Sequence, residues 1–229
     1  MPLDDSILGQ GVYTPREAAR LVGTSSQQVL RWTRGSGPNE PLWPAHYQFI
    51  DEDVTDISFL DLIEVRVVTA LRRKNISLQA IRFAIECAKD KYGISRPLAS
   101  QSFQTDGDEI LMEAIEGESD LVSLSKKRPG QKVFKEIIFQ SLSDLEYEDE
   151  IAARWRPRGF SEVIIDPGRQ FGDPILDSFG ISTSIIYKEY NEFKDLKYLS
   201  EIYEIPQKVL KTCISFESKL DKAHGQSSL

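Results

Sequence analysis

Hydrophobic positions near the start of the chain recur every three to four residues, which is the spacing of amphipathic helices. Two short stretches have this pattern, one from Pro15 to Val22 and one that follows Ser25 or Ser26 and reaches Arg34, and they are separated by Gly23, which suits a tight turn. Thr14 can cap the first helix, and Ser25 or Ser26 can cap the second. The pattern predicts a helix, a turn and a second helix.

Two longer periodic segments follow, residues 59–74 between Ser58 and the cap Asn75, and residues 78 to about 92 between Ser77 and Gly93. They predict two helices that are too apolar to lie alone on a small domain. We therefore expect one of them to pack against a second protomer, which makes a homodimer.

A β-hairpin is predicted between the two pairs of helices. Residues 35–44 are rich in Gly and Pro, and the aromatic run Trp43, Tyr47 and Phe49 follows. A hairpin beside a helix-turn-helix touches the phosphate backbone of DNA, for which His46 and Tyr47 are candidates. The alternative is that these aromatic rings close a small core.

The second half of the chain shows shorter patterns. Apolar and polar residues alternate over residues 109–114, 121–125 and 131–139, which predicts short antiparallel strands. Residues 163–167 and 171–176 then predict two more strands. Helices are expected over residues 182–193, from Leu196, and from Pro206 onward, and the last two form a second helix-turn-helix pattern.

These elements predict an α+β protein with three parts. Residues 1–97 form a winged helix-turn-helix, residues 98–160 a β-rich connector, and residues 161–229 a small helical domain.

The formal net charge of -8 is unevenly distributed. Residues 1–100 hold 12 basic and 12 acidic side chains, residues 101–160 hold 8 and 13, and residues 161–229 hold 8 and 11. The neutral first part favours contact with DNA there, and the acidic remainder favours a basic protein partner.

Several classes of function have no support in the residues. Two distant cysteines and two histidines predict no metal site, no cofactor and no disulfide framework. No nucleophile motif, Gly-rich phosphate loop or carboxylate cluster is present, so we expect no enzyme activity. No apolar run is long enough to span a bilayer and no signal peptide begins the chain, which favours the cytoplasm.

The outer face of the second predicted helix is the candidate site for double-stranded DNA. Amide side chains pair with adenine, and guanidinium groups pair with guanine or phosphate. The alternative is a plain packing motif with ordinary surface residues. With the neighbouring serines, the first helix and the hairpin, the candidate DNA-binding residues are Arg16, Ser25, Ser26, Gln27, Gln28, Arg31, Arg34, His46 and Tyr47.

Residues 13–35, 57–66 and 76–82 together resemble the winged helix-turn-helix of the MerR-like family. The resemblance covers about residues 12–95 and implies a DNA-binding head. Family members usually continue into a long dimerisation helix and an effector domain, and metal-sensing members carry cysteines near it. This chain has no such cysteines.

The C-terminal segment resembles the domain of unknown function 433 found in VapB-type antitoxins. In that family a strand ending in Asp-Pro, a Gly-x-Pro turn and two helices recur. The matching positions are Asp166, Pro167, Phe171, Gly172, Pro174, Ile175, Ile181, Ile185, Tyr203, Ile205, Pro206, Val209 and Phe216.

Together the two resemblances imply an antitoxin that neutralises a PIN-like, VapC-type ribonuclease toxin and represses the shared promoter. A stand-alone MerR-like regulator that responds to a small molecule is the alternative. A third reading is an interaction module whose helix-turn-helix units only pack.

Overall fold

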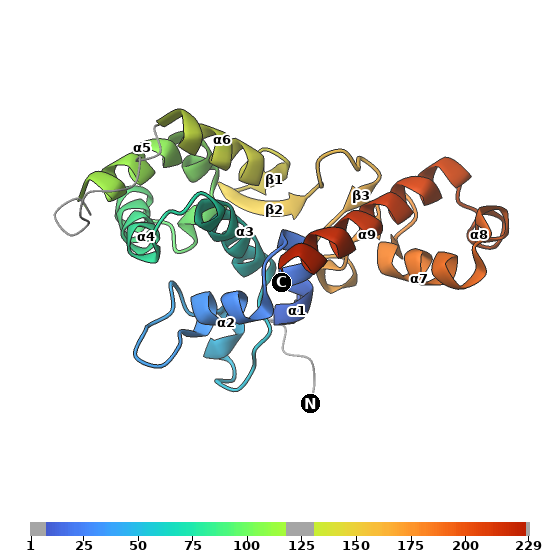
Figure 1. The fold of residues 1–229 in the computed structure, drawn as a ribbon, viewed down its shortest axis with the longest axis horizontal. Coiled ribbons are helices and arrows are strands. Elements are labelled where there is room, and N and C mark those ends of the chain that lie inside the picture. Colours follow the sequence, from blue (N-terminus) through green and yellow to red (C-terminus); the bar gives the residue numbers. More distant parts are fainter. Residues whose placement is uncertain (1–7, 118–130, 228–229) are drawn as a thin grey trace.

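The computed structural model describes residues 8–117 and 131–227. It is an α+β structure with small antiparallel sheets (Figure 1). The α-helices are α1 (Pro15–Val22), α2 (Ser26–Arg34), α3 (Phe59–Arg73), α4 (Leu78–Tyr92), α5 (Gln101–Gly117), α6 (Gln131–Leu142), α7 (Thr183–Phe193), α8 (Leu196–Tyr203) and α9 (Gln207–Ser227). The strands are β1 (Leu145–Glu148), β2 (Ile151–Trp155), β3 (Val163–Ile164), β4 (Ile175–Leu176) and β5 (Ile181–Ser182).

The predicted first helix, turn and second helix are present as α1 and α2. Thr14 and Ser25 each cap a helix through a capping box, in which the cap side chain and the third helical residue satisfy each other's backbone amides. Gly23 ends α1 with φ 70°, a left-handed conformation that glycine adopts without strain. The local residues alone therefore account for this turn.

Helices α3 and α4 begin and end where their caps predict. Ser58 and Ser77 accept hydrogen bonds from the first turns, and Gly93 closes α4. Their apolar faces are covered within the chain, because α6 packs against α3 and α5 packs against α4. The argument that a second protomer must cover one of them is therefore wrong for these faces.

The strands predicted over residues 109–114 and 131–139 are wrong, because both segments lie in helices α5 and α6. Over a few residues, apolar positions on one side of a helix can look like the alternation of a strand. Over the full length of each segment, the apolar residues recur every three to four positions, which is the spacing of a helix. The segment 121–125 lies outside the described residues. The buried side chains that show this spacing are Ile110, Leu111 and Ala114 in α5 and Phe134, Ile137, Ile138 and Leu142 in α6.

Antiparallel pairing appears instead just after α6, where β1 and β2 form a hairpin. The acidic run of residues 146–150 forms its first strand and its turn. Arg154 binds Glu146 at 2.8 Å and Glu148 at 2.5 Å across the pair. These carboxylates are therefore paired within the chain at the surface.

The predicted hairpin over residues 43–50 is also wrong. His46–Phe49 form a 3-10 helix, and the nearby β-structure is a single bridge between Ser36 and Asn39. Buried Asp61 of α3 explains the difference, since it accepts hydrogen bonds from the Trp43 indole and the His46 amide, both at 2.9 Å. These bonds draw the segment onto α3 instead of letting it pair as a strand.

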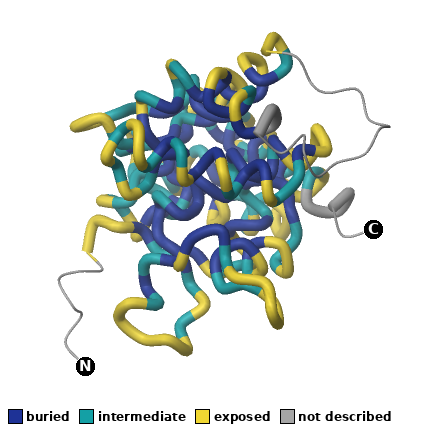
Figure 2. The backbone as a smooth tube through the Cα atoms, turned by 90° about the vertical axis from the view of Figure 1, so that its left-hand side faces the viewer, coloured by how far each residue is buried: buried dark blue, intermediate teal, exposed yellow. Residues whose placement is uncertain are grey.

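Residues 163–220 form a second hydrophobic cluster around the sheet β3–β4–β5 and helices α7–α9. The helices expected in this C-terminal unit are confirmed, and strands are present at residues 163–164 and 175–176, each paired over two residues. The start of the strand predicted over residues 171–176 is wrong, because Gln170–Gly172 form a 3-10 helix. Helix α9 reaches back to α1 (Figure 1). Figure 2 shows buried backbone running through the centre, with exposed segments at the loops.

Polar contacts join the C-terminal unit to α1 and to Tyr13, two residues before it. The Tyr13 hydroxyl donates to the Gly172 carbonyl at 2.9 Å. The Arg20 guanidinium pairs with Glu217 and Asp221 of α9, each at 2.7 Å. The side chain of Glu217 is almost fully buried, so its charge is balanced by this ion pair. The helix-turn-helix and the C-terminal unit are thus bound to each other.

A second buried carboxylate, Glu64, lies beside Arg96 at 3.0 Å. Burial raises the pKa of Glu64 from 4.5 to about 7, and the Arg96 charge offsets only part of this effect. Because the folded state binds this proton more tightly than the unfolded state, Glu64 favours folding at low pH. That contribution falls as the pH rises from about 4.5 through 7.

We predict that Glu64→Gln removes this pH dependence. One pKa unit corresponds to about 1.4 kcal/mol, so the free energy of unfolding of the wild type should fall relative to the variant by about 2 kcal/mol between pH 5 and pH 8. Urea unfolding at both pH values measures this difference. Glu86→Gln, at an exposed position of α4, is the control. Parallel pH profiles for wild type and Glu64→Gln would contradict the prediction.

Candidate nucleic-acid interface

The outer face of α2 presents polar side chains to solvent. Gln27 and Arg31 are exposed one helical turn apart, while Val29 and Trp32 on the other side are buried in the core. Ser26 begins the helix beside them. An amide and a guanidinium on consecutive turns can donate to base edges in the major groove, and the width of that groove admits a helix. The structure therefore leaves this pair available for DNA.

Two of the predicted DNA-binding residues are occupied by the cap of α2. The Ser25 hydroxyl accepts from the backbone amide of Gln28 at 3.3 Å. The side-chain oxygen of Gln28 in turn accepts from the Thr24 hydroxyl. These bonds satisfy polar groups at the helix start that otherwise lack partners. Ser25 and Gln28 therefore hold the start of α2 in place.

Arg34 lies at the last position of α2 and turns toward the following loop. Its guanidinium donates to the carbonyl of Val54 at 2.5 Å and to the carbonyl of Glu52. A charged donor on two backbone acceptors anchors residues 52–54 to the end of the helix. Arg34 therefore has a structural role, because its guanidinium holds this loop against the end of α2.

The two candidates from the expected hairpin lie in the 3-10 helix. Tyr47 is buried, with 3% of its surface exposed, and its hydroxyl donates to the Gly11 carbonyl. Burial raises the pKa of Tyr47 to about 12. The expectation that Tyr47 contacts DNA is therefore wrong, since its ring closes the core. His46 is half-buried, and its backbone amide is bound to Asp61.

The sequence did not predict that a second arginine, Arg82, lies near Arg31 in the folded protein. Arg31 and Arg82 line one hollow of about 690 Å³ between α2, α4 and the loop before Leu42. The Arg82 guanidinium donates to the carbonyls of Pro41 at 2.6 Å and Glu40 at 3.0 Å. No periodicity in the sequence brings α4 beside α2, so only the tertiary structure places Arg82 here. Arg16, exposed on the first turn of α1, adds a further cation to the same domain.

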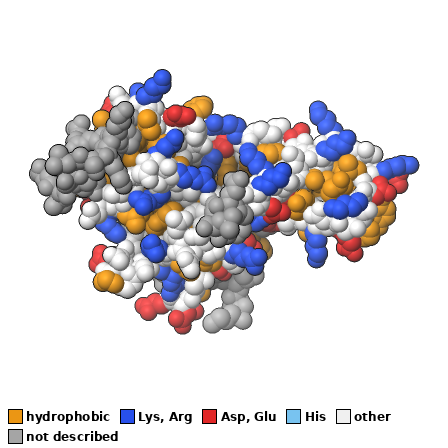
Figure 3. All heavy atoms as spheres, viewed as in Figure 1, with side chains coloured by type: hydrophobic (Ala, Val, Ile, Leu, Met, Phe, Trp, Pro, Cys, Tyr) orange, Lys and Arg blue, Asp and Glu red, His pale blue; other side chains and the backbone are white. Residues whose placement is uncertain are grey.

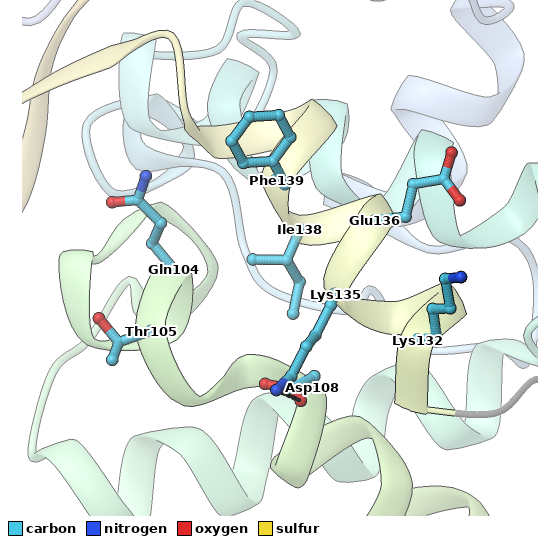
Figure 4. A pocket seen from close by; sticks show the side chains of 8 residues that line it. All are labelled: Gln104, Thr105, Asp108, Lys132, Lys135, Glu136, Ile138 and Phe139. Atoms are coloured by element: carbon cyan, nitrogen blue, oxygen red, sulfur yellow. Dashed lines mark ion pairs between the residues drawn. The ribbon is translucent and has the colours of Figure 1, made fainter.

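A second hollow, of about 770 Å³, lies between α5 and α6 (Figure 4). Its α6 side carries Lys132, Lys135, Ile138 and Phe139, and Asp108 of α5 pairs with Lys135 at 3.7 Å. The volume is within the usual range for small-molecule sites, whereas such sites are mostly apolar. The charged lining of this hollow gives little support to an apolar effector pocket.

Two features bear on other kinds of site. Among residues 8–117 and 131–227, no group of three or more His, Cys, Asp and Glu side chains is arranged to hold a metal ion. Within the same ranges, no helix has the length and apolar composition needed to cross a bilayer.

The fold resembles that of a solved protein. The crystal structure of Rv2018 from Mycobacterium tuberculosis matches with a TM-score of 0.67, covering 88% of this chain and 96% of that chain. The sequences are 24% identical, so the likeness shows a shared fold. No family model matches the chain.

A sequence relative carries a functional name. Over 135 residues the chain is 35% identical to a protein of Mycobacterium tuberculosis strain H37Rv named "Putative antitoxin VapB45". The match spans 55% of this chain and 56% of the relative, which is about half the length of each.

We predict that Arg34 and Arg31 differ in their effect on stability. Arg34→Ala removes a charged donor from two carbonyls and should lower the free energy of unfolding by about 1–3 kcal/mol. Arg34→Lys should recover part of this loss. Arg31→Ala should change it by less than about 0.5 kcal/mol, because Arg31 is exposed. Equal losses for Arg31→Ala and Arg34→Ala in urea unfolding would contradict this assignment.

Proposed function

We propose that this chain is the antitoxin of a type II toxin–antitoxin system. It binds and neutralises a PIN-like, VapC-type ribonuclease and represses its own operon by binding DNA. The observation that carries the proposal is the 35% identity over 135 residues to the relative named as an antitoxin. The exposed Gln27 and Arg31 on a capped second helix support the DNA-binding part.

In this proposal the first part of the chain is a MerR-like head that reads the operator. Helix α2 enters the major groove, where Gln27 and Arg31 contact base edges and Ser26 approaches the backbone. Arg16 and His46 lie on the same head and serve as candidates for phosphate contacts. A homodimer would present two copies of α2 to two half-sites about one helical turn apart.

The remainder of the chain has the opposite charge balance. Residues 101–229 hold 16 basic and 24 acidic side chains, which suits a basic partner. A nuclease that binds RNA needs a cationic surface for the phosphate backbone. We therefore assign toxin binding to this part, with residues 161–229 as the antitoxin-associated domain of the type called domain of unknown function 433.

The DNA-binding part is tested with Arg31→Ala and Gln27→Ala. Each should weaken binding to the chain's own promoter fragment about 5- to 150-fold, since a good base contact is worth roughly 1–3 kcal/mol. Titration at several salt concentrations measures this. Lys197→Ala, at an exposed position of α8, is the control. Unchanged affinity in both α2 variants would show that α2 does not read this DNA.

The antitoxin part is tested by expressing the neighbouring gene with and without this chain. We expect its product to arrest growth alone and to form a stable complex with this chain that restores growth. Arg31→Ala should still restore growth, because the two activities use different surfaces. A harmless neighbour that forms no complex would contradict the proposal.

A harmless neighbouring gene whose product forms no complex with this chain would favour a stand-alone regulator that responds to a small molecule. The α5–α6 hollow would then be the place to look for the ligand, and Lys135→Ala should weaken the ligand's effect on promoter binding. An unaltered response would exclude this hollow as the effector site.

A further inference from the structure

Helix α9 carries positive charge along its whole solvent-exposed side. Its inner side is buried and consists of Leu210, Cys213, Phe216, Glu217 and Leu220. The outer side carries four exposed lysines at helical spacing, which are Lys208, Lys211, Lys219 and Lys222. Exposed Ser215 lies on the same side, midway between Lys211 and Lys219. We call these four lysines the lysine stripe. Figure 3, in the view of Figure 1, shows Lys and Arg side chains over the region of α9.

Carboxylates do not neutralise the lysine stripe. The two acidic residues of α9, Glu217 and Asp221, lie away from it and both pair with Arg20 at 2.7 Å. Among the described residues, none of the four lysines forms an ion pair. Exposed Glu204 precedes the helix, at the end far from α1. The outer side of α9 is therefore positive, although residues 161–229 as a whole are net acidic.

A neighbouring arginine widens the positive surface around Lys219. Lys219, Arg158 and Arg66 line one hollow of about 180 Å³. The lining also includes the carboxylate of Asp144, which pairs with Arg66 at 2.9 Å. Arg158 is exposed, and its guanidinium donates to the carbonyl of Phe139 at 3.1 Å, so its positive charge is held in place without being neutralised. The charges of Lys219 and Arg158 thus add to each other at the surface.

The lysine stripe begins beside the turn between α1 and α2. A methyl group built on Gly23 of that turn would lie 3.7 Å from the Cβ of Ala223, which directly follows Lys222. The Arg73 guanidinium donates to the Gly23 carbonyl at 2.6 Å and brings a further positive charge to the same place. The stripe is therefore continuous with the part of the chain that holds the candidate DNA-binding helix.

The length of the lysine stripe fits a polyanion. Lys208 and Lys222 are fourteen residues apart, which is about 21 Å along a helix. Successive phosphates of one DNA strand are about 3.4 Å apart along the duplex axis, so the stripe matches a run of about six phosphates. Lysine ammonium groups bind phosphates as point charges and need no particular base sequence. The position of the stripe beside the turn before α2 favours double-stranded DNA as this polyanion.

We propose that the lysine stripe of α9 binds the phosphate backbone of the DNA that flanks the site read by α2. This inference rests on the proposed DNA-binding function and adds a second contact surface to it. Helix α2 supplies the base contacts, whereas the stripe supplies affinity that does not depend on sequence. The ion pairs of Arg20 with Glu217 and Asp221 hold α9 against α1, so both surfaces belong to one framework.

The test uses the full chain and its own promoter fragment as the probe. The double variant Lys219→Gln with Lys222→Gln should reduce the slope of log affinity against log salt by about two, because each phosphate contact contributes about 0.9. The advantage of the wild type over this variant should therefore shrink about tenfold between 50 and 200 mM salt. The matched control is Lys188→Gln with Lys197→Gln, which removes two exposed lysines from α7 and α8. It should leave the affinity within about twofold.

A second duplex of the same length and scrambled sequence separates phosphate contacts from base contacts. The Lys219→Gln, Lys222→Gln variant should lose affinity for both duplexes by the same factor, whereas Arg31→Ala should weaken binding to the promoter more than to the scrambled duplex. In hydroxyl-radical footprinting, the lysine variant should lose protection of the flanking phosphates and keep protection of the site itself. Circular dichroism should be unchanged in all variants.

The outcomes separate this inference from the proposed function. If the wild type binds the promoter and the lysine variant has the same affinity and salt slope, the stripe does not contact DNA and the proposed function stands. If the wild type binds no DNA, the DNA-binding part of the proposed function fails together with the inference. If the lysine variant binds DNA normally but loses the complex with the product of the neighbouring gene, the occupant is an acidic protein surface and the inference is overturned.

Discussion

The buried carboxylate of Asp61 organises the first half of this protein. Its side chain has no exposed surface, so its charge and its lone pairs must be satisfied inside the fold. It accepts from the Trp43 indole, the His46 amide and the Ser58 cap, and it pairs with Arg96 at 2.7 Å. One side chain thus fixes the start of α3, the path of residues 43–47 and the approach to α5. The surroundings of α2 follow from these bonds.

A second buried carboxylate, Glu217, joins the two ends of the molecule. It binds Arg20 of α1 and accepts a hydrogen bond from Thr183 at the start of α7. Helix α1 therefore packs against α2 on one side and against α9 on the other. Because the same residue contacts α1 and α7, the orientation of α1 relative to α7 is defined. A partner on one surface and DNA on the other would be held by a single framework.

Local chemistry made much of this fold predictable. Caps such as Thr14, Ser58 and Ser77 act within one helical turn, so the sequence alone places the starts of α1, α3 and α4. The predictions of secondary structure failed for two reasons: a contact from another part of the chain, and a pattern that was too short. The 43–50 segment became a 3-10 helix through Asp61, and α5 and α6 were misread because short alternating windows also fit one side of a helix. The packing of α6 on α3 and of α5 on α4 depends on the tertiary structure, so no local sequence pattern predicts it.

The sequence predicted which helix carries the candidate site, but it did not predict which side chains of the site remain exposed. A polar side chain on the outer face of a helix is available to DNA only if the protein does not use it first. Arg34 holds two loop carbonyls and Tyr47 lies in the core, whereas Gln27 and Arg31 remain exposed. The distinction depends on where residues 52–54 and Gly11 lie in space. Tertiary structure therefore narrows the predicted list to the side chains whose donors still face solvent. Arg82 of α4 lines the same hollow as Arg31, but its guanidinium already donates to the carbonyls of Glu40 and Pro41.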